Sequence, residues 1–327
     1  MGMKGARIKM TFWDNKNILI TGGAGFLGST LVKKLKEKGI KEENIRIPLI
    51  EDTDLRHWEN CIRVVRDIDI VIHLAGKVGG IGCNRRYPAE FFYDNAVMGI
   101  QMMEAARQAG EPPRRMGVEK FVVIGTVCSY PKHTPIPLKE KNLWSGYPEE
   151  TNAPYALAKK MMLVQSQAYR KQYGFNSINL LLSNLYGSGD NFDLESSHVI
   201  PATIRKCIEA VEGNKKEIEI WGTGNASREF LYVEDAARAI ILATEKYNKS
   251  EPINIGTGIE IKIKDLVKLI AKLTGFKGRI VWDITKPDGQ PRRCSNISKA
   301  KKEFNFEAEA DFIEGIEKTI RWWKNER

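Results

Sequence analysis

The sequence predicts an α/β fold, in which a Rossmann-like, doubly wound parallel sheet is followed by a smaller C-terminal α/β domain. Three observations predict it. Short, continuously apolar segments alternate with helical patterns through the first half of the chain, as in parallel sheets that helices cover on both faces. A glycine-rich turn follows the first apolar segment. After residue 184 the alternation gives way to polar loops and shorter apolar segments.

The expected elements follow from the spacing of apolar residues along the chain. In the first half, we expect strands at residues 17–21, 44–48, 69–74, 121–124 and 177–182, and helices at 26–38, 89–109 and 155–173. In the second half, we expect helices at 199–211, 234–246, 263–274 and near the C-terminus, and strands at 217–221, 230–233, 252–255 and 279–282. Residues 110–115 indicate a loop insertion.

These elements predict two domains. Residues 12–183 are expected to form a dinucleotide-binding domain, to which residues 228–256 return. Residues 184–227 and 257–327 are expected to form a substrate domain. We find no clear linker and no internal repeat.

Composition and charge exclude several classes of protein. The chain has 327 residues, of which 42% are hydrophobic, which suffices for a large core and excludes intrinsic disorder. No apolar run approaches the roughly 18–20 residues that cross a bilayer, and residues 1–10 lack the apolar stretch of a secretory signal. The net charge is +10, but the basic residues are interleaved with acidic ones. We therefore expect anionic small molecules as partners, and neither nucleic acid nor a membrane.

Cysteine and histidine spacing gives no sign of a disulfide framework or a metal site. The five cysteines are scattered and form no C-x-x-C pair, which favours the reducing cytoplasm. The four histidines lack the spacing typical of metal ligands. We therefore expect no protein-bound metal.

The glycine-rich turn lies between the first expected strand and the first expected helix, at residues 22–28. Glycines there allow a tight turn and a close approach of the backbone to a pyrophosphate, which the free N–H groups of the helix N-terminus can bind. In this strand-turn-helix context the motif predicts dinucleotide binding.

The second expected strand should end near the residue that contacts the adenosine ribose. Glu51 or Asp52 could accept a hydrogen bond from a ribose diol, which favours NAD. Arg46 and Arg56 could contact the 2′-phosphate of NADP only if the loop brings them round. The spacing leaves the choice of cofactor open.

Tyr155 and Lys159 form a Y-x-x-x-K motif, in which both side chains lie on one face of a helix. A nearby ammonium, together with an oxidised nicotinamide, would lower the pKa of the phenol and make it a useful acid or base. Thr126 follows a buried strand and should face the ligand crevice at the carboxyl end of the sheet. A hydroxyl there could bind a substrate carbonyl together with Tyr155.

Cys128 and His198 each have two interpretations. A thiol and an imidazole can both exchange protons near neutral pH. A lone cysteine is, however, more often a small buried hydrophobe, and a lone histidine is often structural. The residues alone favour these plainer interpretations.

Together the glycine turn, Thr126 and the Tyr155/Lys159 pair resemble the extended short-chain dehydrogenase/reductase superfamily. More narrowly, several segments resemble the GDP-L-fucose synthase family, which consists of GDP-4-keto-6-deoxymannose epimerase-reductases. These are residues 75–81, 128–132, 197–202, 221–224, 228–230, 254–258 and 286–292. The resemblance extends from about residue 17 to the C-terminus and favours catalytic roles for Cys128 and His198.

The resemblance implies NADP(H)-dependent conversion of GDP-4-dehydro-6-deoxy-D-mannose to GDP-L-fucose. C3 and C5 are inverted first, and the C4 ketone is then reduced. Thr126 and Tyr155 would stabilise negative charge on the ketone oxygen, and Cys128 and His198 would exchange protons at the neighbouring carbons. Tyr155 would protonate the alkoxide, and Lys159 would hold the ribose and lower the pKa of Tyr155.

The resemblance also implies binding residues and an assembly. The cofactor residues would be Gly22, Gly23, Ala24, Gly25, Phe26, Leu27, Gly28, Asp54, Leu55, Leu74, Ala75, Gly76, Tyr155, Lys159, Asn184, Leu185, Tyr186 and His198. The residues for the GDP-sugar would be Lys206, Trp221, Arg228 and Asp288. The assembly would be a homodimer.

Three departures from the family pattern bear on these roles. Thr126 stands where the family usually has serine, and Lys206 stands where it often has arginine. The second-strand region carries Glu51 and Asp52 and lacks the arginine that the family uses for the 2′-phosphate. NADP(H) is therefore favoured by the resemblance, while NAD(H) stays open as an alternative.

Two other functions are weighed against this one. A related NAD-dependent sugar-nucleotide epimerase or dehydratase would recycle its cofactor and show no net consumption of it. A non-enzymatic nucleotide-sensing or scaffold protein would not need the intact set of Thr126, Tyr155 and Lys159.

Overall fold

The computed structural model of the chain describes residues 11–109 and 117–326. The N-terminal extension at residues 1–10 and the expected loop insertion at residues 110–115 lie outside this part of the chain. No helix in the described ranges is long and apolar enough to cross a membrane.

A six-stranded, fully parallel sheet lies at the centre of the larger part of the molecule. Its strands, in spatial order, are β2 (Ile45–Arg46), β1 (Ile18–Thr21), β3 (Ile70–His73), β4 (Lys120–Thr126), β5 (Ser177–Leu182) and β9 (Ile253–Ile255). The strands β1, β3, β4 and β5 are buried along their whole length, which explains their continuous apolar sequences. The strand order reverses between β1 and β3, and ligands of such sheets bind outside the carboxyl ends of the strands at this point.

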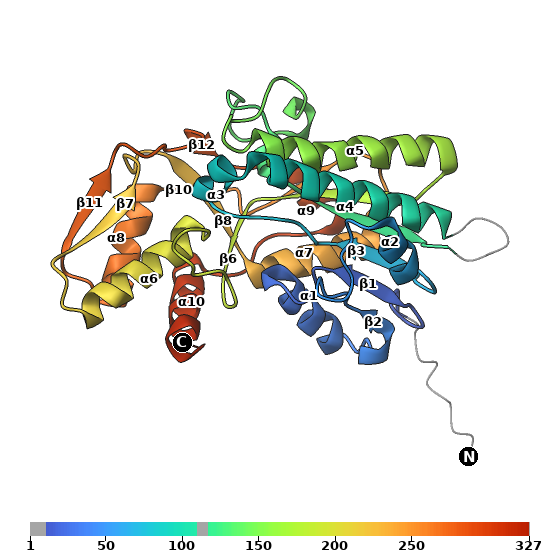
Figure 1. Cartoon of the computed structure of the whole chain (residues 1–327), viewed down its shortest axis with the longest axis horizontal. Helices are drawn as coiled ribbons and strands as arrows, with labels where there is room; N and C mark the ends of the chain where they lie inside the picture. Colours follow the sequence, from blue (N-terminus) through green and yellow to red (C-terminus); the bar gives the residue numbers. More distant parts are fainter. Residues whose placement is uncertain (1–10, 110–116, 327) are drawn as a thin grey trace, which may run out of the picture.

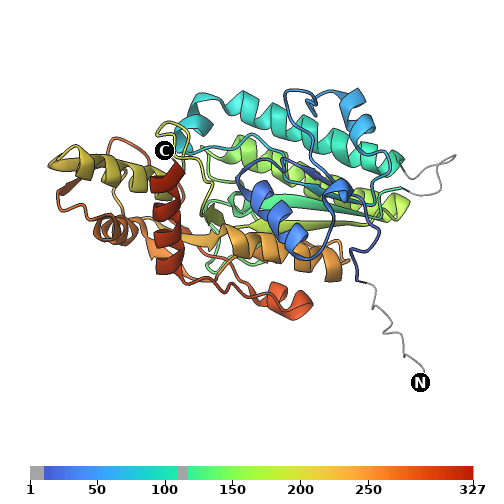
Figure 2. The same cartoon turned by 90° about the horizontal axis from the view of Figure 1, so that it is seen from below.

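Helices cover both faces of this sheet (Figures 1 and 2). On one face, α4 (Pro88–Gln108) packs along α5 (Ala153–Tyr173), and α2 (Trp58–Val64) packs beside α4. On the other face lie α1 (Phe26–Glu37), α7 (Val233–Lys246) and α9 (Ser298–Phe304). The main core therefore has two apolar layers, one on each side of the sheet.

The smaller part of the molecule contains two further sheets. In the first, β8 (Ser227–Tyr232) pairs with β6 (Asn184–Tyr186) and β12 (Arg292–Arg293) in parallel and with β10 (Glu260–Lys262) in antiparallel orientation. In the second, β7 (Glu217–Trp221) pairs in parallel with β11 (Arg279–Asp283). The helices α6 (Val199–Glu212), α8 (Ile263–Thr274) and α10 (Phe312–Glu326) enclose a separate core.

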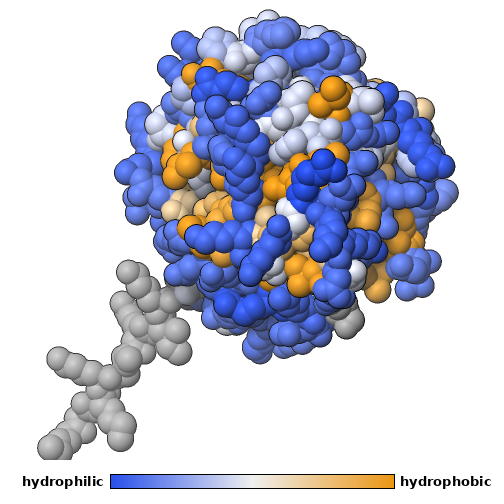
Figure 3. Space-filling model, turned by 90° about the vertical axis from the view of Figure 1, so that its left-hand side faces the viewer, coloured by the Kyte–Doolittle hydropathy of each residue, from blue (hydrophilic) through white to orange (hydrophobic). Residues whose placement is uncertain are grey.

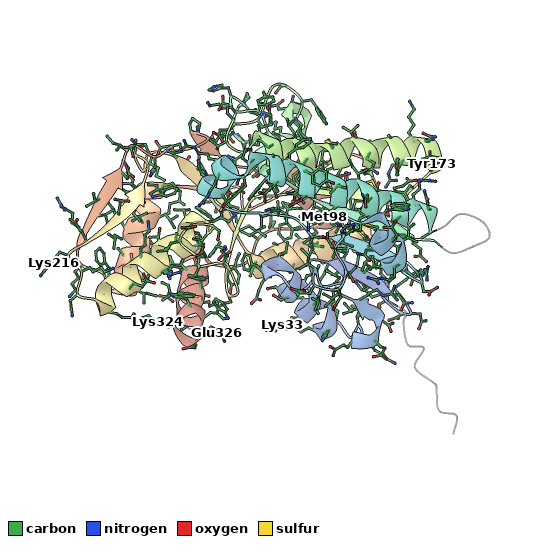
Figure 4. All side chains as sticks on the ribbon, viewed as in Figure 1. Lys33, Met98, Tyr173, Lys216, Lys324 and Glu326 are labelled. Carbon is green, nitrogen blue, oxygen red and sulfur yellow. The ribbon has the colours of Figure 1, made fainter. Side chains whose placement is uncertain are left out.

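The two parts lie side by side along the longest axis of the molecule (Figure 1). Lys216, between α6 and β7, marks the tip of the smaller part, and Tyr173, at the end of α5, lies at the opposite side (Figure 4). The face at the tip is mostly hydrophilic, with hydrophobic side chains visible between the charged ones (Figure 3).

The chain passes between the two parts several times. Only Ser183 separates β5 of the main sheet from β6 of the smaller one, and α7 begins directly after β8. The elements α7 and β9 belong to the main layers, although the segment before them, from β6 to β8, lies in the smaller part. The boundaries of the two domains stay a prediction.

The structure differs from the expected elements mainly in short segments. The expected strand at 44–48 is only two residues long, and Pro48, which lacks an N–H donor, lies beyond its end. Sequence analysis missed α2, α3 (Ile81–Arg86), β6, β10 and β12. These elements have seven residues or fewer, too few to show a clear apolar period.

Candidate active site

The glycine turn joins β1 to α1 at the carboxyl end of the main sheet. Gly22 has a φ of +69°, and a Cβ there would lie 2.9 Å from the Ala75 backbone nitrogen. A Cβ on Gly28 would lie only 2.1 Å from the Gly22 carbonyl oxygen. Helix α1 has no side-chain cap at Gly25, so the N–H groups of its first turn are available to an anion.

A cavity of about 360 Å³ opens at this end of the sheet. It is lined by all five residues predicted to be catalytic, Thr126, Cys128, Tyr155, Lys159 and His198. The other predicted cofactor residues that line it are Gly22, Gly25, Phe26, Leu27, Gly28, Leu74, Ala75, Gly76, Asn184 and Leu185. The cavity thus brings together residues from both halves of the chain.

Five predicted cofactor residues do not line this cavity: Gly23, Ala24, Asp54, Leu55 and Tyr186. Gly23 and Leu55 are buried, and the Asp54 carboxylate pairs with Arg56. The Tyr186 ring packs against Phe230, Tyr232 and Phe312 in the smaller core. Tyr186 is therefore placed as a core residue, while its neighbours Asn184 and Leu185 reach the cavity.

A second cavity, of about 220 Å³, adjoins the first. It is lined by the four residues predicted to bind the GDP-sugar, Lys206, Trp221, Arg228 and Asp288. Cys128, Asn152, Asn184, Ser197 and His198 line both cavities. The thiol and the imidazole therefore lie where the two spaces meet.

Thr126 and Cys128 are positioned by the end of β4. Thr126 is the last residue of the strand, and its Oγ1 accepts a hydrogen bond from the Cys128 backbone N–H at 3.1 Å. This bond caps the short 3₁₀ helix Val127–Ser129 and fixes the cysteine two residues beyond the threonine. The strand, a rigid element, thus holds both groups at the mouth of the crevice.

Tyr155 and Lys159 lie one turn apart near the start of α5, with the Lys159 Nζ 5.9 Å from the centre of the Tyr155 ring. A Cβ on Gly76 would lie 3.3 Å from this Nζ, so the glycine leaves room for the ammonium. Burial lowers the pKa of Lys159 to about 8. Burial also raises the pKa of Tyr155, because it disfavours the phenolate. The lowering expected from Lys159 together with an oxidised nicotinamide stays a prediction.

His198 is the last residue before α6 and is open to both cavities. Burial, followed by the charge of Arg293, lowers the pKa of its imidazole. This arginine was not found by sequence analysis. Its Nη1 donates to the Cys128 Sγ at 3.2 Å, a contact between residues 165 positions apart that no sequence spacing reveals.

Three of the predicted GDP-sugar residues are held by hydrogen bonds, and two of them, Arg228 and Asp288, contact each other. The Arg228 guanidinium donates to the Asp288 backbone oxygen at 2.9 Å. The Asp288 carboxylate accepts from the backbone N–H and the hydroxyl of Thr223 at 2.7 and 2.6 Å. The Lys206 Nζ donates to the Glu219 oxygen at 2.8 Å. Lys206, Arg228 and Arg293 all line the second cavity, which suits an anion such as a diphosphate.

Asp190 is a further residue that sequence analysis missed. It lines the first cavity and is 8% exposed. Its Oδ1 accepts from the Asn191 N–H at 2.7 Å, but its buried Oδ2 has no hydrogen-bond partner among the described residues. Burial raises the pKa of the carboxyl to about 7. The sequence did not indicate this burial, because Asp190 is a polar residue within a glycine-rich loop.

The two arginines considered for a 2′-phosphate are both engaged elsewhere. Arg46 donates to the backbone oxygens of Val64 and Arg66 at 2.9 and 2.7 Å. Arg56 pairs with Asp54 at 2.7 Å and with Asp94 at 3.3 Å. Its hydrogen bonds to these two carboxylates raise the pKa of the Arg56 guanidinium. The hydrogen bond from Arg56 lowers the pKa of the Asp54 carboxyl. In the described part of the chain, no cluster of three or more His, Cys, Asp or Glu residues could hold a metal ion.

Comparison with known proteins places the chain in a family. Residues 18–256 match the NAD dependent epimerase/dehydratase family. A probable GDP-L-fucose synthase of Oryza sativa is 37% identical over 306 residues, which cover 94% of this chain and 91% of the relative.

Two solved structures extend the comparison. A GDP-6-OMe-4-keto-L-xylo-heptose reductase from C. jejuni superposes with a TM-score of 0.87 at 28% identity, covering 96% of this chain and 99% of the other. A GDP-L-fucose synthetase from Naegleria fowleri bound to NADP superposes with a TM-score of 0.82 at 27% identity, covering 97% and 96%. The family and its NADP-bound members indicate a nicotinamide cofactor. The chain belongs to the NAD dependent epimerase/dehydratase family of enzymes and, within it, is similar to the GDP-L-fucose synthases.

Proposed function

We propose that this enzyme converts GDP-4-dehydro-6-deoxy-D-mannose to GDP-L-fucose by 3,5-epimerisation followed by reduction of the 4-ketone. The observation that carries the proposal is the meeting of the two cavities at Cys128 and His198. A sugar at this junction has the thiol and imidazole beside it and the Thr126 and Tyr155 hydroxyls within the same space. Epimerisation and reduction need these two sets of groups at adjoining carbons.

In the first stage, Cys128 and His198 exchange protons at C3 and C5. The C4 ketone makes the adjoining C–H bonds acidic, because the electron pair can move onto the carbonyl oxygen. Thr126 and Tyr155 donate hydrogen bonds to that oxygen and stabilise the enolate. A lowered His198 pKa makes its protonated form a stronger proton donor.

In the second stage, Tyr155 protonates the oxygen at C4. A reduced nicotinamide, when bound, supplies the hydride. A raised pKa keeps Tyr155 protonated before the reaction, as a general acid requires. Lys159 binds the nicotinamide ribose, and Lys206, Trp221, Arg228 and Asp288 hold the GDP moiety.

We propose NADP(H) as the cofactor, with NAD(H) accepted as well. The NADP-bound relative supports NADP(H). Arg46 and Arg56 are both engaged in other contacts, so neither guanidinium is available to a 2′-phosphate. We therefore expect only a weak preference for NADP(H) over NAD(H). Rates of ketone reduction with NADPH and NADH that differ by less than about tenfold would agree with this arrangement.

The test is to incubate the protein with GDP-4-dehydro-6-deoxy-D-mannose and either NADPH or NADH and to identify the product by NMR. We expect GDP-L-fucose and stoichiometric consumption of the cofactor. A product formed without net consumption indicates an epimerase that recycles its cofactor. A reduced product with unchanged C3 and C5 indicates a reductase alone.

Replacing Tyr155 with phenylalanine separates the two stages. Tyr155→Phe should abolish reduction, because no acid remains for the alkoxide, while deuterium from solvent still enters C3 and C5. NMR of the recovered sugar measures both. Loss of deuterium uptake together with reduction contradicts the separation of roles.

We further propose a homodimer formed through α4 and α5. Exposed apolar side chains on these helices, Ile100, Met161 and Val164, line an open groove together with Trp144 from the loop before α5. Burying these side chains against a second copy would remove them from water. The five free cysteines support a reducing compartment, which we propose to be the cytoplasm.

A further inference from the structure

We propose that Arg293 is a positioning residue that holds the Cys128 sulfur and stabilises the anionic form in which this thiol acts in the epimerisation. This inference rests on the proposed function and adds a residue that acts through Cys128. The contact that suggests it is the hydrogen bond from Arg293 Nη1 to Cys128 Sγ at 3.2 Å.

Arg293 is a rigid, buried group. Only 4% of it is exposed, and β12 places it directly beside Arg228 of β8. Its Nε and Nη2 donate to the Gln290 Oε1 at 3.2 and 3.0 Å. Gln290 is itself buried, with 2% exposed, and its amide contacts the Pro131 oxygen at 3.5 Å. One edge of the guanidinium is thus fixed by a neutral amide, and the remaining nitrogen faces the sulfur.

Arg293 forms no ion pair among the described residues, and its hydrogen bonds there go to Gln290 and to the Cys128 sulfur. A buried cation without a counter-ion is costly. An anionic sulfur at hydrogen-bond distance offsets that cost, and a neighbouring arginine is known to favour the reactive thiolate.

The other titratable groups around Cys128 agree with this role. Burial lowers the pKa of Arg228 of β8, and a charged sulfur opposes this by raising it, as do the nearby carboxyls of Asp288 and Glu149. On α5, a charged sulfur adds to burial in raising the pKa of Tyr155 and so favours its neutral form. His198, which precedes α6, lines the same two cavities, and Arg293 helps to lower its pKa. Two guanidinium groups thus lie near the sulfur, and the charge of Arg293 disfavours protonation of the His198 imidazole.

The step is a simple proton transfer. The thiolate removes the proton from the carbon next to the ketone, the C–H bond breaks and an S–H bond forms. The electron pair moves to the ketone oxygen, which Thr126 and Tyr155 hold. Protonated His198 returns a proton, drawn from solvent, to the opposite face.

Thiol reactivity tests the inference without any substrate. The full-length protein is alkylated with iodoacetamide at several pH values, and modified peptides are quantified by mass spectrometry. Cys83, the other thiol that is not buried, serves as internal reference. At pH 7 we expect Arg293→Met to slow alkylation of Cys128 by about tenfold or more relative to Cys83, and Arg293→Lys to retain part of the rate. The difference should shrink at high pH, where the thiol ionises unaided.

A diphosphate-binding role for Arg293 is the competing explanation. It predicts that Arg293→Met weakens GDP binding, measured by calorimetry, and leaves Cys128 alkylation unchanged; this result would overturn the inference. Gln290→Leu, which frees the guanidinium without removing it, should slow alkylation less than Arg293→Met. If Arg293→Met fails to fold, the same comparison with Arg293→Lys and Gln290→Leu decides.

Deuterium uptake at C3 and C5 links the contact to catalysis. If Arg293 acts through the sulfur, Arg293→Met adds little to the loss already caused by Cys128→Ser, because the two effects are not additive. Additive losses contradict the inference. Alkylation needs no sugar, so its result does not depend on the proposed substrate. If Arg293→Met lowers Cys128 reactivity but the unmodified enzyme forms a product other than GDP-L-fucose, this inference stands and only the proposed substrate is rejected.

Discussion

Lys159 is a buried cation with a pKa of about 8, and this value sets a pH limit on cofactor binding. In the proposed function its ammonium donates to the ribose. As the pH rises through about 8 the free enzyme loses this proton, so affinity for the reduced cofactor should fall by up to about tenfold per pH unit. Cofactor fluorescence titrations between pH 7 and 9.5 measure the effect. Lys159→Met should bind weakly at every pH, and a pH-independent affinity of the unmodified enzyme contradicts the prediction.

Asp190 makes a second pH-dependent contribution, to stability. Its folded-state pKa of about 7 lies above the ordinary value of 3.8. At low pH the carboxyl is protonated in the folded and the unfolded protein alike. The destabilisation that its buried charge causes grows as the pH rises from about 4 to 7 and is constant above pH 7. Asp190→Asn should therefore stabilise the ligand-free protein above pH 7, by on the order of 1–4 kcal/mol, and have little effect at pH 4.

Thermal unfolding at pH 4, 6 and 8 measures the effect of Asp190→Asn. Asp193→Asn is the matched control, because this exposed carboxyl accepts from Ser196 and has a lowered pKa. It should not stabilise the protein at pH 8. An Asp190→Asn variant whose stabilisation is the same at all three pH values would show that the carboxylate charge is not the cause.

Some residues of the site could be predicted from the sequence and others could not. The glycine turn and the Tyr155/Lys159 pair were predicted because their function depends on residues at a fixed, short spacing. Arg293 was not, because its contact with Cys128 depends on β12 pairing with β8. The raised pKa of Tyr155 was not foreseen either, since burial is a property of the packed molecule.

At the scale of elements, the turn between β1 and α1 depends on Gly28 more than on Gly25. A Cβ on Gly28 would clash with the Gly22 oxygen at 2.1 Å, whereas one on Gly25 would lie 3.3 Å from the same atom. Gly28→Ala should lower the free energy of unfolding by about 1–3 kcal/mol and weaken cofactor binding. Gly25→Ala should leave the stability of the ligand-free protein nearly unchanged. Urea denaturation compares them, and equal losses would refute the steric explanation.

The long elements were predicted well and the short ones poorly, for a physical reason. The helices α5 and α8 and the strands β3 and β5 carry enough apolar residues to show their period or their burial. By contrast, β12 consists of two arginines that pair with β8. Its conformation comes from that partner, which lies far away in the sequence.

At the scale of the whole molecule, the apolar groove on α4 and α5 predicts self-association. Val164 is 50% exposed on α5 and lines this groove. Val164→Glu should convert the proposed dimer to a monomer, because a charge would be buried in the interface. Light scattering after size exclusion measures the mass. Val211→Glu, on α6 and away from the groove, is the control and should not change it.

If the unmodified protein is already monomeric, the proposed interface is wrong. Such a result would leave the active-site proposal unaffected, because both cavities are lined by residues of one chain.

The repeated passage of the chain between the two parts has a consequence for synthesis. Helix α7 and strand β9 complete the main layers, and the buried Lys120 of β4 donates to the oxygens of Thr244 and Tyr247 at the end of α7. A nascent chain therefore cannot finish its first large core until residue 255 has left the ribosome. Until then the edge of β5 that later pairs with β9 is exposed and can pair with other chains. At high expression levels we therefore expect nascent chains to aggregate at this stage.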